Sequence, residues 1–514
     1  MIATHSKRGL MPTLQIKHLT VDHRRDLRCL IQDLSFTLRE GDKAAIIGEE
    51  GNGKSTLLKL IYDPSLIESY CEHSGEIIRH GRICYLEQEL PKEKAGMTVY
   101  ELFCSVPGFF DRSPGELART AQSMGLPADI YYADQKLGTL SGGESVKIRL
   151  LSLVTSQPDI LLLDEPSNDL DIPALEWLEG FIKDSDVPVL YISHDETLLE
   201  NTANVIIHLE QVRRKTIPVC TVARCGYREY AECRKAARSH QTQVARKEQA
   251  EYEKQQEKFR RIQSRVEHEQ NVISRSDPHG GRLLKKKMAA VKSMERRFER
   301  EYSEMTQLPE TEDEIFVRFS PEISASRGKT ILDLHLDELT NECGVLARGI
   351  DLHINGGEKI CMIGRNGAGK TTLLRIMAER LFNRTDIKVG YMPQNYTECM
   401  DMSLTPVEFL SRTGDKDELT AIRTYLGSMR YTAAETEHSI SALSGGQKAK
   451  LYFIAMNLDR CDVLLLDEPT RNFSPLSGPV IRHALKEYGG TIISVSHDRK
   501  FISEVCDRIY HLGE

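Results

Sequence analysis

The sequence lacks three features that would assign it to a membrane, secreted or disulfide-rich class. No window holds about eighteen or more consecutive apolar residues, so we expect no membrane-spanning helix. The opening stretch MIATHSKRGLMPT has no apolar run of the signal-peptide kind, which favours a cytoplasmic location. The 12 cysteines are scattered without a CxxC pair, so we expect reduced, mostly buried thiols and not a disulfide or zinc framework.

The composition is that of a globular protein with more than one core. The chain has 514 residues, of which 40% are hydrophobic and 28% charged, and its net charge is −8. This balance is typical of soluble folded domains. The length predicts two or three domains.

Four short motifs occur twice in the same order. The pairs are GEEGNGKST (48–56) with GRNGAGKTT (364–372), LSGGE (140–144) with LSGGQ (443–447), ILLLDEP (160–166) with VLLLDEP (463–469), and ISHD (192–195) with VSHD (495–498). Glu165 precedes His194 by 29 positions, and Glu468 precedes His497 by the same 29. The repeat predicts a tandem duplication of one ATPase domain.

Both copies of the first motif fit GxxxxGK[ST], a loop whose backbone N–H groups surround phosphate oxygens at a helix N-terminus. The apolar stretches KAAIIG and KICMIG predict a buried strand before each loop, and TLLKLI and TLLRIM predict a helix after it. Lys54 and Lys370 would neutralise the β- and γ-phosphates of ATP. The predicted ATP-binding residues of the loops are Gly48, Glu49, Glu50, Gly51, Asn52, Gly53, Lys54, Ser55 and Thr56, and Gly364, Arg365, Asn366, Gly367, Ala368, Gly369, Lys370, Thr371 and Thr372.

The other repeated motifs supply the groups that phosphate chemistry needs. Four aliphatic residues before Asp164 and before Asp467 predict buried parallel strands that bring a carboxylate to the edge of a sheet. The glutamates that follow would polarise the attacking water, and the histidines would hold the γ-phosphate. The predicted catalytic residues are Glu165, Glu468, His194 and His497, and the predicted Mg²⁺ ligands are Ser55, Gln88, Asp164, Thr371, Gln394 and Asp467.

Each motif also has a structural interpretation. A single GxxxxGKS can occur by chance in an ordinary turn, and a lone histidine such as His194 is more often structural than catalytic. The duplication at equal spacing favours the functional interpretation in both halves.

An LSGG motif between a phosphate loop and a DEP motif resembles the ATP-binding cassette (ABC) ATPases. The resemblance implies an α/β fold with two tandem P-loop ABC ATPase domains that pair head to tail and hold two ATP with Mg²⁺. The resemblance implies further nucleotide-binding residues. They are Gln88, Gln394 and the LSGG residues Ser141, Gly142, Gly143, Ser444, Gly445 and Gly446. Each LSGG motif would face the phosphate loop of the other half.

Three features argue against a transporter: the absence of a membrane segment, the fusion of both halves in one chain, and an unusual linker at 223–306. The linker stretch from His240 to Gln270 has no Gly or Pro and predicts a helix. SRSDPHGG (274–281) predicts a break, and a second helix follows it to form a long antiparallel hairpin. The two helices are expected to pack through a thin apolar stripe of Val244, Tyr252, Phe259, Ile262 and Val266 against Leu284, Met288, Val291, Met294 and Phe298. The predicted domains are therefore 1–222, 223–306 and 307–514.

The linker is basic although the chain is acidic. Residues 223–306 hold 21 Lys+Arg and 13 Asp+Glu, a net charge of +8, which leaves −16 for the remainder. A charge run is often only a solvated helix face, but a basic tip in an acidic protein is also typical of a probe that enters a nucleic-acid environment.

Two ATPase halves joined by such a linker resemble the ABC-F proteins, which act on the ribosome. The resemblance implies a monomer whose hairpin reaches toward P-site tRNA and 23S rRNA of the 70S ribosome. The residues proposed to contact RNA are Arg275, His279, Arg282, Lys285, Lys286, Lys287 and Lys292.

Two further comparisons between the halves favour a subgroup. Gln88 and Ser141 are 53 positions apart and Gln394 and Ser444 are 50 apart, which leaves little room for the arm that housekeeping members often carry. The segment 64–74 predicts a loop, and the chain stops about where the second domain should, so no long C-terminal extension is expected.

The segment after DEP reads SNDLD at 167–171 but TRNFS at 470–474, so Phe473 and Ser474 replace a Leu-Asp pair. This departure resembles resistance members that protect Gram-positive ribosomes from lincosamides, pleuromutilins and streptogramin A. It also puts full activity of the Lys54 site in doubt. The alternatives are neutral drift in a housekeeping translation factor and, from another class, an ATPase subunit of an exporter. The sequence identifies no aromatic residue that stacks on adenine.

Overall fold

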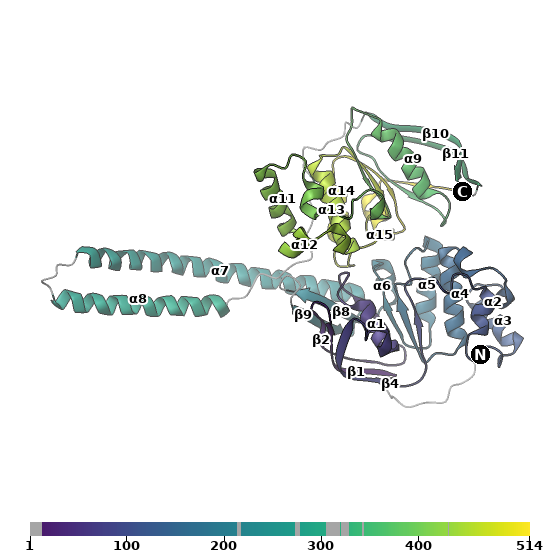
Figure 1. The fold of residues 1–514 in the computed structure, drawn as a ribbon, viewed down its shortest axis with the longest axis horizontal. Coiled ribbons are helices and arrows are strands. Elements are labelled where there is room, and N and C mark those ends of the chain that lie inside the picture. Colours follow the sequence, from purple (N-terminus) through teal and green to yellow (C-terminus); the bar gives the residue numbers. More distant parts are fainter. Residues whose placement is uncertain are drawn as a thin grey trace. The chain divides into compact units, whose positions relative to one another are not determined.

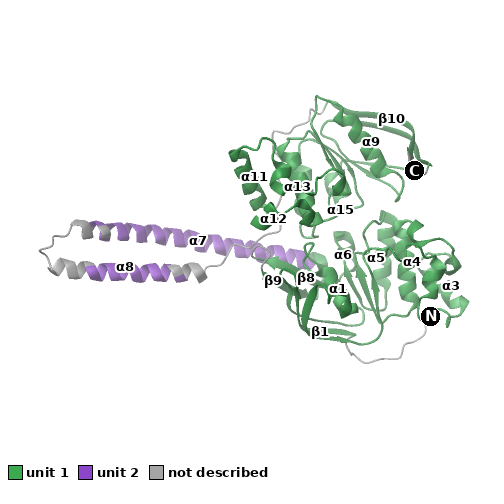
Figure 2. Ribbon diagram, in the orientation of Figure 1, with its two compact units in different colours: residues 1–228, 312–514 green, residues 229–311 purple. Residues whose placement is uncertain are grey.

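The computed structural model describes residues 13–212, 217–272, 278–304, 319, 328–341, 344–429 and 431–513. The chain forms two compact units (Figure 2). The first contains residues 1–228 and 312–514, and therefore both ATPase halves, and the second contains residues 229–311. The domain boundaries given above remain a prediction.

The first half builds two sheets (Figure 1). An antiparallel sheet has the order β2-β1-β4, from β1 (Leu14–His23), β2 (Cys29–Leu38) and β4 (Cys71–Arg79). A second sheet has the order β5-β6-β7-β3-β8-β9, from β3 (Lys43–Ile47), β5 (Ile83–Leu86), β6 (Ile160–Asp164), β7 (Val189–Ile192), β8 (Val205–Val212) and β9 (Ile217–Ala223). Its pairs are parallel except β8 with β9, and β3, β6 and β7 are buried throughout. The predicted buried strands before the phosphate loop and before the DEP motif are confirmed.

The helices of this half include the one that the sequence predicted after the phosphate loop. They are α1 (Lys54–Tyr62), α2 (Val99–Cys104), α3 (Pro114–Ser123), α4 (Gly142–Thr155), α5 (Ile172–Asp184) and α6 (Glu196–Thr202), with short 3₁₀ turns η1 (Pro64–Leu66), η2 (Ile130–Tyr132) and η3 (Leu137–Thr139). The phosphate loop thus leads from β3 directly into α1, and the first LSGG motif leads into α4.

The second half repeats this plan. Its parallel sheet has the order β13-β14-β15-β12-β16, from β12 (Lys359–Ile363), β13 (Val389–Met392), β14 (Val463–Asp467), β15 (Thr491–Val495) and β16 (Arg508–His511). Strands β10 (Thr330–Asn341) and β11 (Gly344–Asn355) form an antiparallel pair. The helices are α9 (Lys370–Phe382), α10 (Pro406–Leu410), α11 (Lys416–Ser428), α12 (Ala433–Glu437), α13 (Gly445–Leu458), α14 (Gly478–Glu487) and α15 (Arg499–Val505), with the 3₁₀ turns η5 (Tyr396–Glu398) and η6 (Ile440–Ala442).

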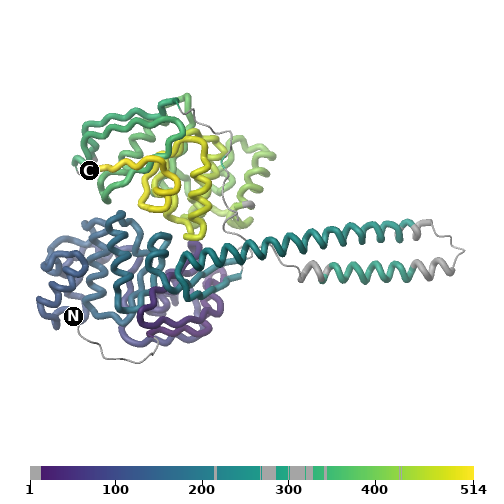
Figure 3. The backbone as a smooth tube through the Cα atoms, turned by 180° about the vertical axis from the view of Figure 1, so that it is seen from behind, coloured from purple at the N-terminus to yellow at the C-terminus, as the bar shows by residue number. Residues whose placement is uncertain are grey.

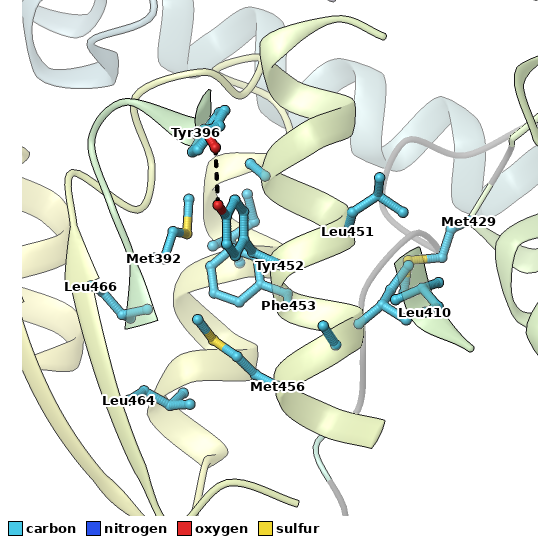
Figure 4. Close-up of a cluster of buried hydrophobic side chains, with 14 of the residues drawn as sticks. Met392, Tyr396, Leu410, Met429, Leu451, Tyr452, Phe453, Met456, Leu464 and Leu466 are labelled. Carbon is cyan, nitrogen blue, oxygen red and sulfur yellow. Dashed lines mark hydrogen bonds between the residues drawn. The ribbon is translucent and has the colours of Figure 1, made fainter. Parts of the chain in front are cut away.

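The core of the second half shows how α13 is held. Tyr452, Phe453 and Met456 of α13 are buried with Met392 of β13 and Leu464 of β14 (Figure 4). The Tyr452 hydroxyl donates to the backbone oxygen of Tyr396 at 3.2 Å, the dashed line in Figure 4. This packing fixes the helix whose N-terminus carries the second LSGG motif.

The segment 64–74 is not the loop that the sequence predicted. Pro64–Leu66 form η1, and β4 begins at Cys71 and pairs with β1. The local pattern EHSGE shows no alternation of apolar and polar residues. Strand β4 can therefore be identified only from its pairing with β1. The cysteine prediction was also too broad: Cys71, Cys84, Cys361 and Cys461 are buried, but Cys233 and Cys399 are exposed.

The second unit contains two long antiparallel helices, most of α7 (Tyr227–Val272) and all of α8 (Pro278–Glu304), which lie side by side in Figures 1 and 3. Val266 and Val291 are buried between them, with Phe259 and Met288 packed against the pair. The Phe259 and Phe298 rings meet edge to face at 5.3 Å. The predicted helical hairpin is confirmed, as is the central part of its apolar stripe.

Two details of that prediction were wrong. Helix α8 begins at Pro278, so the His-Gly-Gly sequence lies in its first turn and does not break it. Proline suits this position because a first-turn residue needs no N–H donor. Ile262 and Met294, predicted members of the stripe, are each 42% exposed. Across the residues the structure describes, no helix is long and apolar enough to cross a membrane.

Candidate nucleotide-binding site

The two phosphate-loop lysines occupy equivalent positions. Lys54 Nζ donates to the backbone oxygens of Gly48 and Glu49 at 2.8 and 3.0 Å. Lys370 Nζ donates to those of Gly364 and Arg365 at 2.9 and 3.0 Å. Burial lowers the pKa of both lysines, while nearby carboxylates oppose that shift. Each ammonium group therefore lies inside its loop, where phosphate oxygens could replace the carbonyl oxygens as partners.

The glycines of these loops allow another backbone segment to pack closely against the loop, or allow the loop to adopt a left-handed conformation. A Cβ on Gly48 would lie 2.2 Å from the Leu209 carbonyl oxygen, and one on Gly364 would lie 2.5 Å from that of Leu512. Gly53 and Gly369 cap α1 and α9 with φ values of 85° and 94°. Side chains are disfavoured at all four positions, so the loops can curl tightly around an anion.

Oxygen donors gather where Mg²⁺ was predicted. The Ser55 hydroxyl donates to Asp164 Oδ1 at 2.9 Å, and the Tyr85 hydroxyl donates to Asp164 Oδ2 at 2.8 Å. In the second half Asp467 Oδ2 is buried and has no hydrogen-bond partner among the described residues. Burial raises the pKa of both aspartates. A hydroxyl, carboxylates and the nearby phosphate pocket fit Mg²⁺, which prefers oxygen ligands.

Glu165 is held by three side chains. It accepts from Gln88 Nε2 at 2.8 Å and from Asn168 Nδ2 at 2.5 Å, and its Oε1 lies 3.6 Å from His194 Nε2. Burial raises the pKa of this carboxyl, but the interactions with His194, Lys54 and Asn168 outweigh it and bring the pKa down to about 2. The group is thus an anion at neutral pH.

Glu468 has a different environment. It accepts weakly from Ser496 Oγ at 3.3 Å and from the His497 N–H at 3.4 Å, and His497 Nε2 is 4.0 Å away. Burial, with the charge of Asp467, raises the pKa of Glu468 to about 8. Burial and Lys370 lower the pKa of His497 to about 4. The two glutamates that the repeat makes equivalent therefore differ in charge near neutral pH.

Both glutamates share one backbone feature. Glu165 has a φ of 47° and Glu468 a φ of 51°, in the left-handed region that non-glycine residues rarely adopt. Strain of this kind is concentrated at functional sites.

Residues from both halves line one cavity of ≈ 500 Å³. From the second half, Lys370, Gln394, Glu468 and His497 contribute to it, and Gly142 contributes from the first LSGG motif. Ser141 and Gly143 are not among its lining residues; Ser141 caps α4. The structure thus brings four residues of one predicted composite site together with the facing motif.

At the other composite site the contact is direct. The N–H of Gly446, in the second LSGG motif, donates to Glu50 Oε2 of the first phosphate loop at 3.1 Å. Ser444 caps α13 through its side chain, so this N–H lies in the first turn of a fourteen-residue helix.

The Phe473-Ser474 departure has a local consequence. In the first half Asp171 caps α5 by accepting from the Ala174 N–H at 3.1 Å. Ser474 takes the equivalent place in the second half, and there α14 begins only at Gly478 without a side-chain cap. The loop so formed presents the Phe473 carbonyl oxygen to His194 Nδ1 at 2.7 Å.

Sequence reasoning missed four residues of the site. Tyr85 holds Asp164, and Asn168 holds Glu165. Arg471 Nη1 lies 2.9 Å from Asp169 Oδ1, and both residues line the cavity. A signal existed for Tyr85, because the tyrosine of YLEQ recurs in YMPQ at 391–394.

The residues proposed for RNA contact are described only in part. Lys285, Lys286, Lys287 and Lys292 are exposed on α8. His279 and Arg282 lie within α8, but their side chains are outside the described residues, as is Arg275 altogether.

Two halves that each carry a phosphate loop, a buried aspartate followed by a glutamate, and an LSGG motif on a helix N-terminus define a tandem ABC ATPase. The chain belongs to the ABC transporter family, whose model matches residues 31–168 and 347–471, just over half of the chain. The protein is therefore an ATPase.

Relatives match nearly the whole chain. ABC transporter F family member 5 of Arabidopsis thaliana is 27% identical over 94% of this chain and 73% of its own. The ribosome protection protein VmlR of Bacillus subtilis (strain 168) is 29% identical over 93% of this chain and 83% of its own. In fold, the chain is similar to the archaeal ribosome recycling factor aABCE1 in a complex with a ribosomal stalk protein, with a TM-score of 0.58, 17% identity and coverage of 96% and 87%.

Proposed function

We propose that this ATPase is an ABC-F protein that binds the 70S ribosome and protects the peptidyl-transferase centre from antibiotics. The α7–α8 hairpin would insert toward P-site tRNA and 23S rRNA. The observation that carries the proposal is a two-helix hairpin, basic in an otherwise acidic chain, between two ATPase halves. Exposed lysines on α8 suit contact with phosphate groups, because an ammonium group is a compact charge with three donors.

Two ATP with Mg²⁺ would hold the halves together in the ribosome-bound state. Lys54 and Lys370 would bind the phosphates, while Ser55, Thr371, Asp164 and Asp467 would hold the metal. Glu165 and Glu468 would orient the attacking water, and His194 and His497 would contact the γ-phosphate. Hydrolysis would then release the protein.

The choice of antibiotic protection over a housekeeping role rests on two features. The departure at 470–474 resembles that of resistance members, and VmlR, a relative over most of the chain, is named a ribosome protection protein. The classes expected are lincosamides, pleuromutilins and streptogramin A.

Cell-free translation stalled by lincomycin or tiamulin tests this proposal. The protein with ATP should restore translation, and a variant with residues 273–277 shortened should bind ribosomes normally yet restore less. Cosedimentation with ribosomes in ATP, beside membrane fractionation, checks the partner. Ribosome binding without restoration would favour a housekeeping factor, and membrane association without ribosome binding would favour an exporter subunit.

A further inference from the structure

The two phosphate loops differ most at the pair of residues after their first glycine. The first loop has Glu49 and Glu50 where the second has Arg365 and Asn366. Beside the lysine that both loops share, this pair gives the first loop two negative charges near the place where ATP phosphates would lie, and it gives the second loop one positive charge. ATP is itself a polyanion, so the first loop is the less favourable one for it.

The Glu50 side chain also takes a backbone N–H group that would otherwise be available to the ATP phosphates. Its Oε2 accepts from the Gly446 N–H at 3.1 Å and lies 3.0 Å from where a Cβ of Gly445 would be. This N–H belongs to the first turn of α13, where the helix dipole and free N–H groups favour an anion. A carboxylate there makes the contact that a terminal phosphate oxygen would make.

The equivalent side chain at the other site, Asn366, makes a different contact. Asn366 Nδ2 donates to the Asp169 backbone oxygen. It is this nitrogen, and not the acceptor oxygen, that faces the first LSGG motif, 3.4 Å from where a Cβ of Gly142 would be, so the neutral amide does not take the N–H groups of α4. Helix α4 does carry Glu144, but that carboxylate accepts from its own Ser141 N–H and hydroxyl at 3.0 and 2.8 Å.

We propose that Glu50 is an internal competitor of ATP, which makes the Lys54 site the weaker of the two nucleotide sites. ATP must displace the carboxylate from the Gly446 N–H before its terminal phosphate can bind there. Glu50 is exposed, so the side chain can leave for solvent without breaking the core. The Lys370 site fills first, and the Lys54 site fills at higher ATP concentration. This inference rests on the proposed ATP-binding role of the two loops.

Equilibrium binding of a fluorescent ATP analogue with Mg²⁺ tests it on the full chain. A Lys370→Ala background leaves the Lys54 site to be measured. Adding Glu50→Asn should tighten binding there by about fivefold or more, since a charge at a helix N-terminus and a freed N–H are both involved. Glu49→Gln is the matched control, because it removes the same charge from the same loop without touching Gly446, and its gain should be clearly smaller.

The reciprocal variant is Asn366→Glu in a Lys54→Ala background, which should weaken binding at the Lys370 site. If Glu49→Gln and Glu50→Asn increased the affinity for the ATP analogue equally, the proposal that Glu50 competes with ATP would be wrong, and only a general effect of charge would remain. Weaker binding by Glu50→Asn would overturn it too, because Glu50 would then assist ATP. The assay contains no ribosome, so its outcome is separate from that of the translation assay.

Discussion

His194 Nδ1, in the first half, lies 2.7 Å from the backbone carbonyl oxygen of Phe473 in the second. A carbonyl oxygen only accepts, so Nδ1 carries the hydrogen and Nε2 is directed at Glu165. The equivalent His497 Nδ1 is buried without a hydrogen-bond partner among the described residues. The altered loop at 470–474 therefore acts on the histidine of the Lys54 site alone.

Hydrolysis should be unequal at the two sites. Glu468→Gln leaves the Lys54 site to hydrolyse ATP, and Glu165→Gln leaves the Lys370 site. The altered loop holds His194 at the Lys54 site, so we expect this site to be the slower one. The residual ATPase rate of Glu468→Gln should therefore be about fivefold lower than that of Glu165→Gln, a difference of about 1 kcal/mol in the activation free energy. The measurement is steady-state phosphate release at saturating ATP, with the double variant as the background.

The same double variant has its own expected phenotype. It should still bind ATP but remain on ribosomes, and it should inhibit growth when expressed. Equal rates for the two single variants would remove the argument from the 470–474 loop, and parental hydrolysis by the double variant would show that the glutamates were misassigned.

The two glutamates should also give opposite pH dependence of stability in the nucleotide-free protein. The folded pKa of Glu468 is about 8, above its usual value of 4.5, so the folded state holds a proton that the unfolded state releases. Its contribution to the free energy of unfolding therefore falls as pH rises from about 4.5 to about 8. Relative to Glu468→Gln, the Tm of the parent should fall across that window.

Glu165→Gln is the control for this experiment. The folded pKa of Glu165 is about 2, below its usual value, so its stabilisation is present above pH 4.5 and is lost as pH falls toward 2. The Tm difference between this variant and the parent should be flat from pH 5 to 8. A flat difference for Glu468→Gln as well would mean that its carboxyl ionises normally.

A buried ion pair between the halves should matter more than an exposed one. Arg482 donates to Glu196 at 2.6 and 3.2 Å and to Glu504 at 2.7 Å, and the Arg482 and Glu196 side chains are 3% and 7% exposed. Arg482→Leu would leave the Glu196 carboxylate buried with Lys500 Nζ at 3.2 Å. We expect a loss of about 3–5 kcal/mol in the free energy of unfolding.

The matched control is Arg412→Leu, since Arg412 pairs with Asp459 at 2.9 Å but is 50% exposed. That change should cost about 1 kcal/mol or less. Urea unfolding of both variants, with Arg482→Leu combined with Glu196→Gln, checks this. The double change should cost less than the sum of the single ones, and full additivity would show that the pair is not coupled.

The sequence predicted the residues of the repeated motifs, and it missed the contacts between residues that are distant in the sequence. The motifs predicted the positions of Lys54, Asp164 and Glu165, because each lies at the end of a buried strand or after it in both copies. It could not distinguish Glu165 from Glu468, because the protonation of Glu165 depends on side chains that approach from distant segments, such as Lys54 and His194. Strand β4 was missed for a similar reason, because its pattern is uninformative without β1.

The hairpin shows the same limit at a smaller scale. Composition predicted both helices, since neither contains an internal breaker over most of its length. The Gly-Gly pair was assigned to the turn because glycine is unfavourable inside a helix. Pro278 starts α8 before that pair, and this local preference decides the boundary.

The lysine cluster Lys285, Lys286 and Lys287 should set ribosome affinity through its charge. These residues are exposed on α8, within the stretch 260–300 that holds 12 Lys+Arg against 5 Asp+Glu. Replacing all three with Gln keeps the helix propensity but removes three positive charges. Fewer phosphate groups are then neutralised, so fewer counterions are released on binding. Cosedimentation from low to high salt should show weaker binding of this variant and a flatter salt dependence.

A matched triple change separates this effect from net charge alone. Lys235, Lys247 and Lys254 are exposed on α7, outside that stretch. Their replacement with Gln removes the same charge from the same hairpin, and it should leave both the affinity and the salt dependence near those of the parent. If the two triple variants weaken binding equally, the hairpin contributes only a diffuse field. If neither does, the cluster is a solvated helix face and ribosome binding resides elsewhere in the chain.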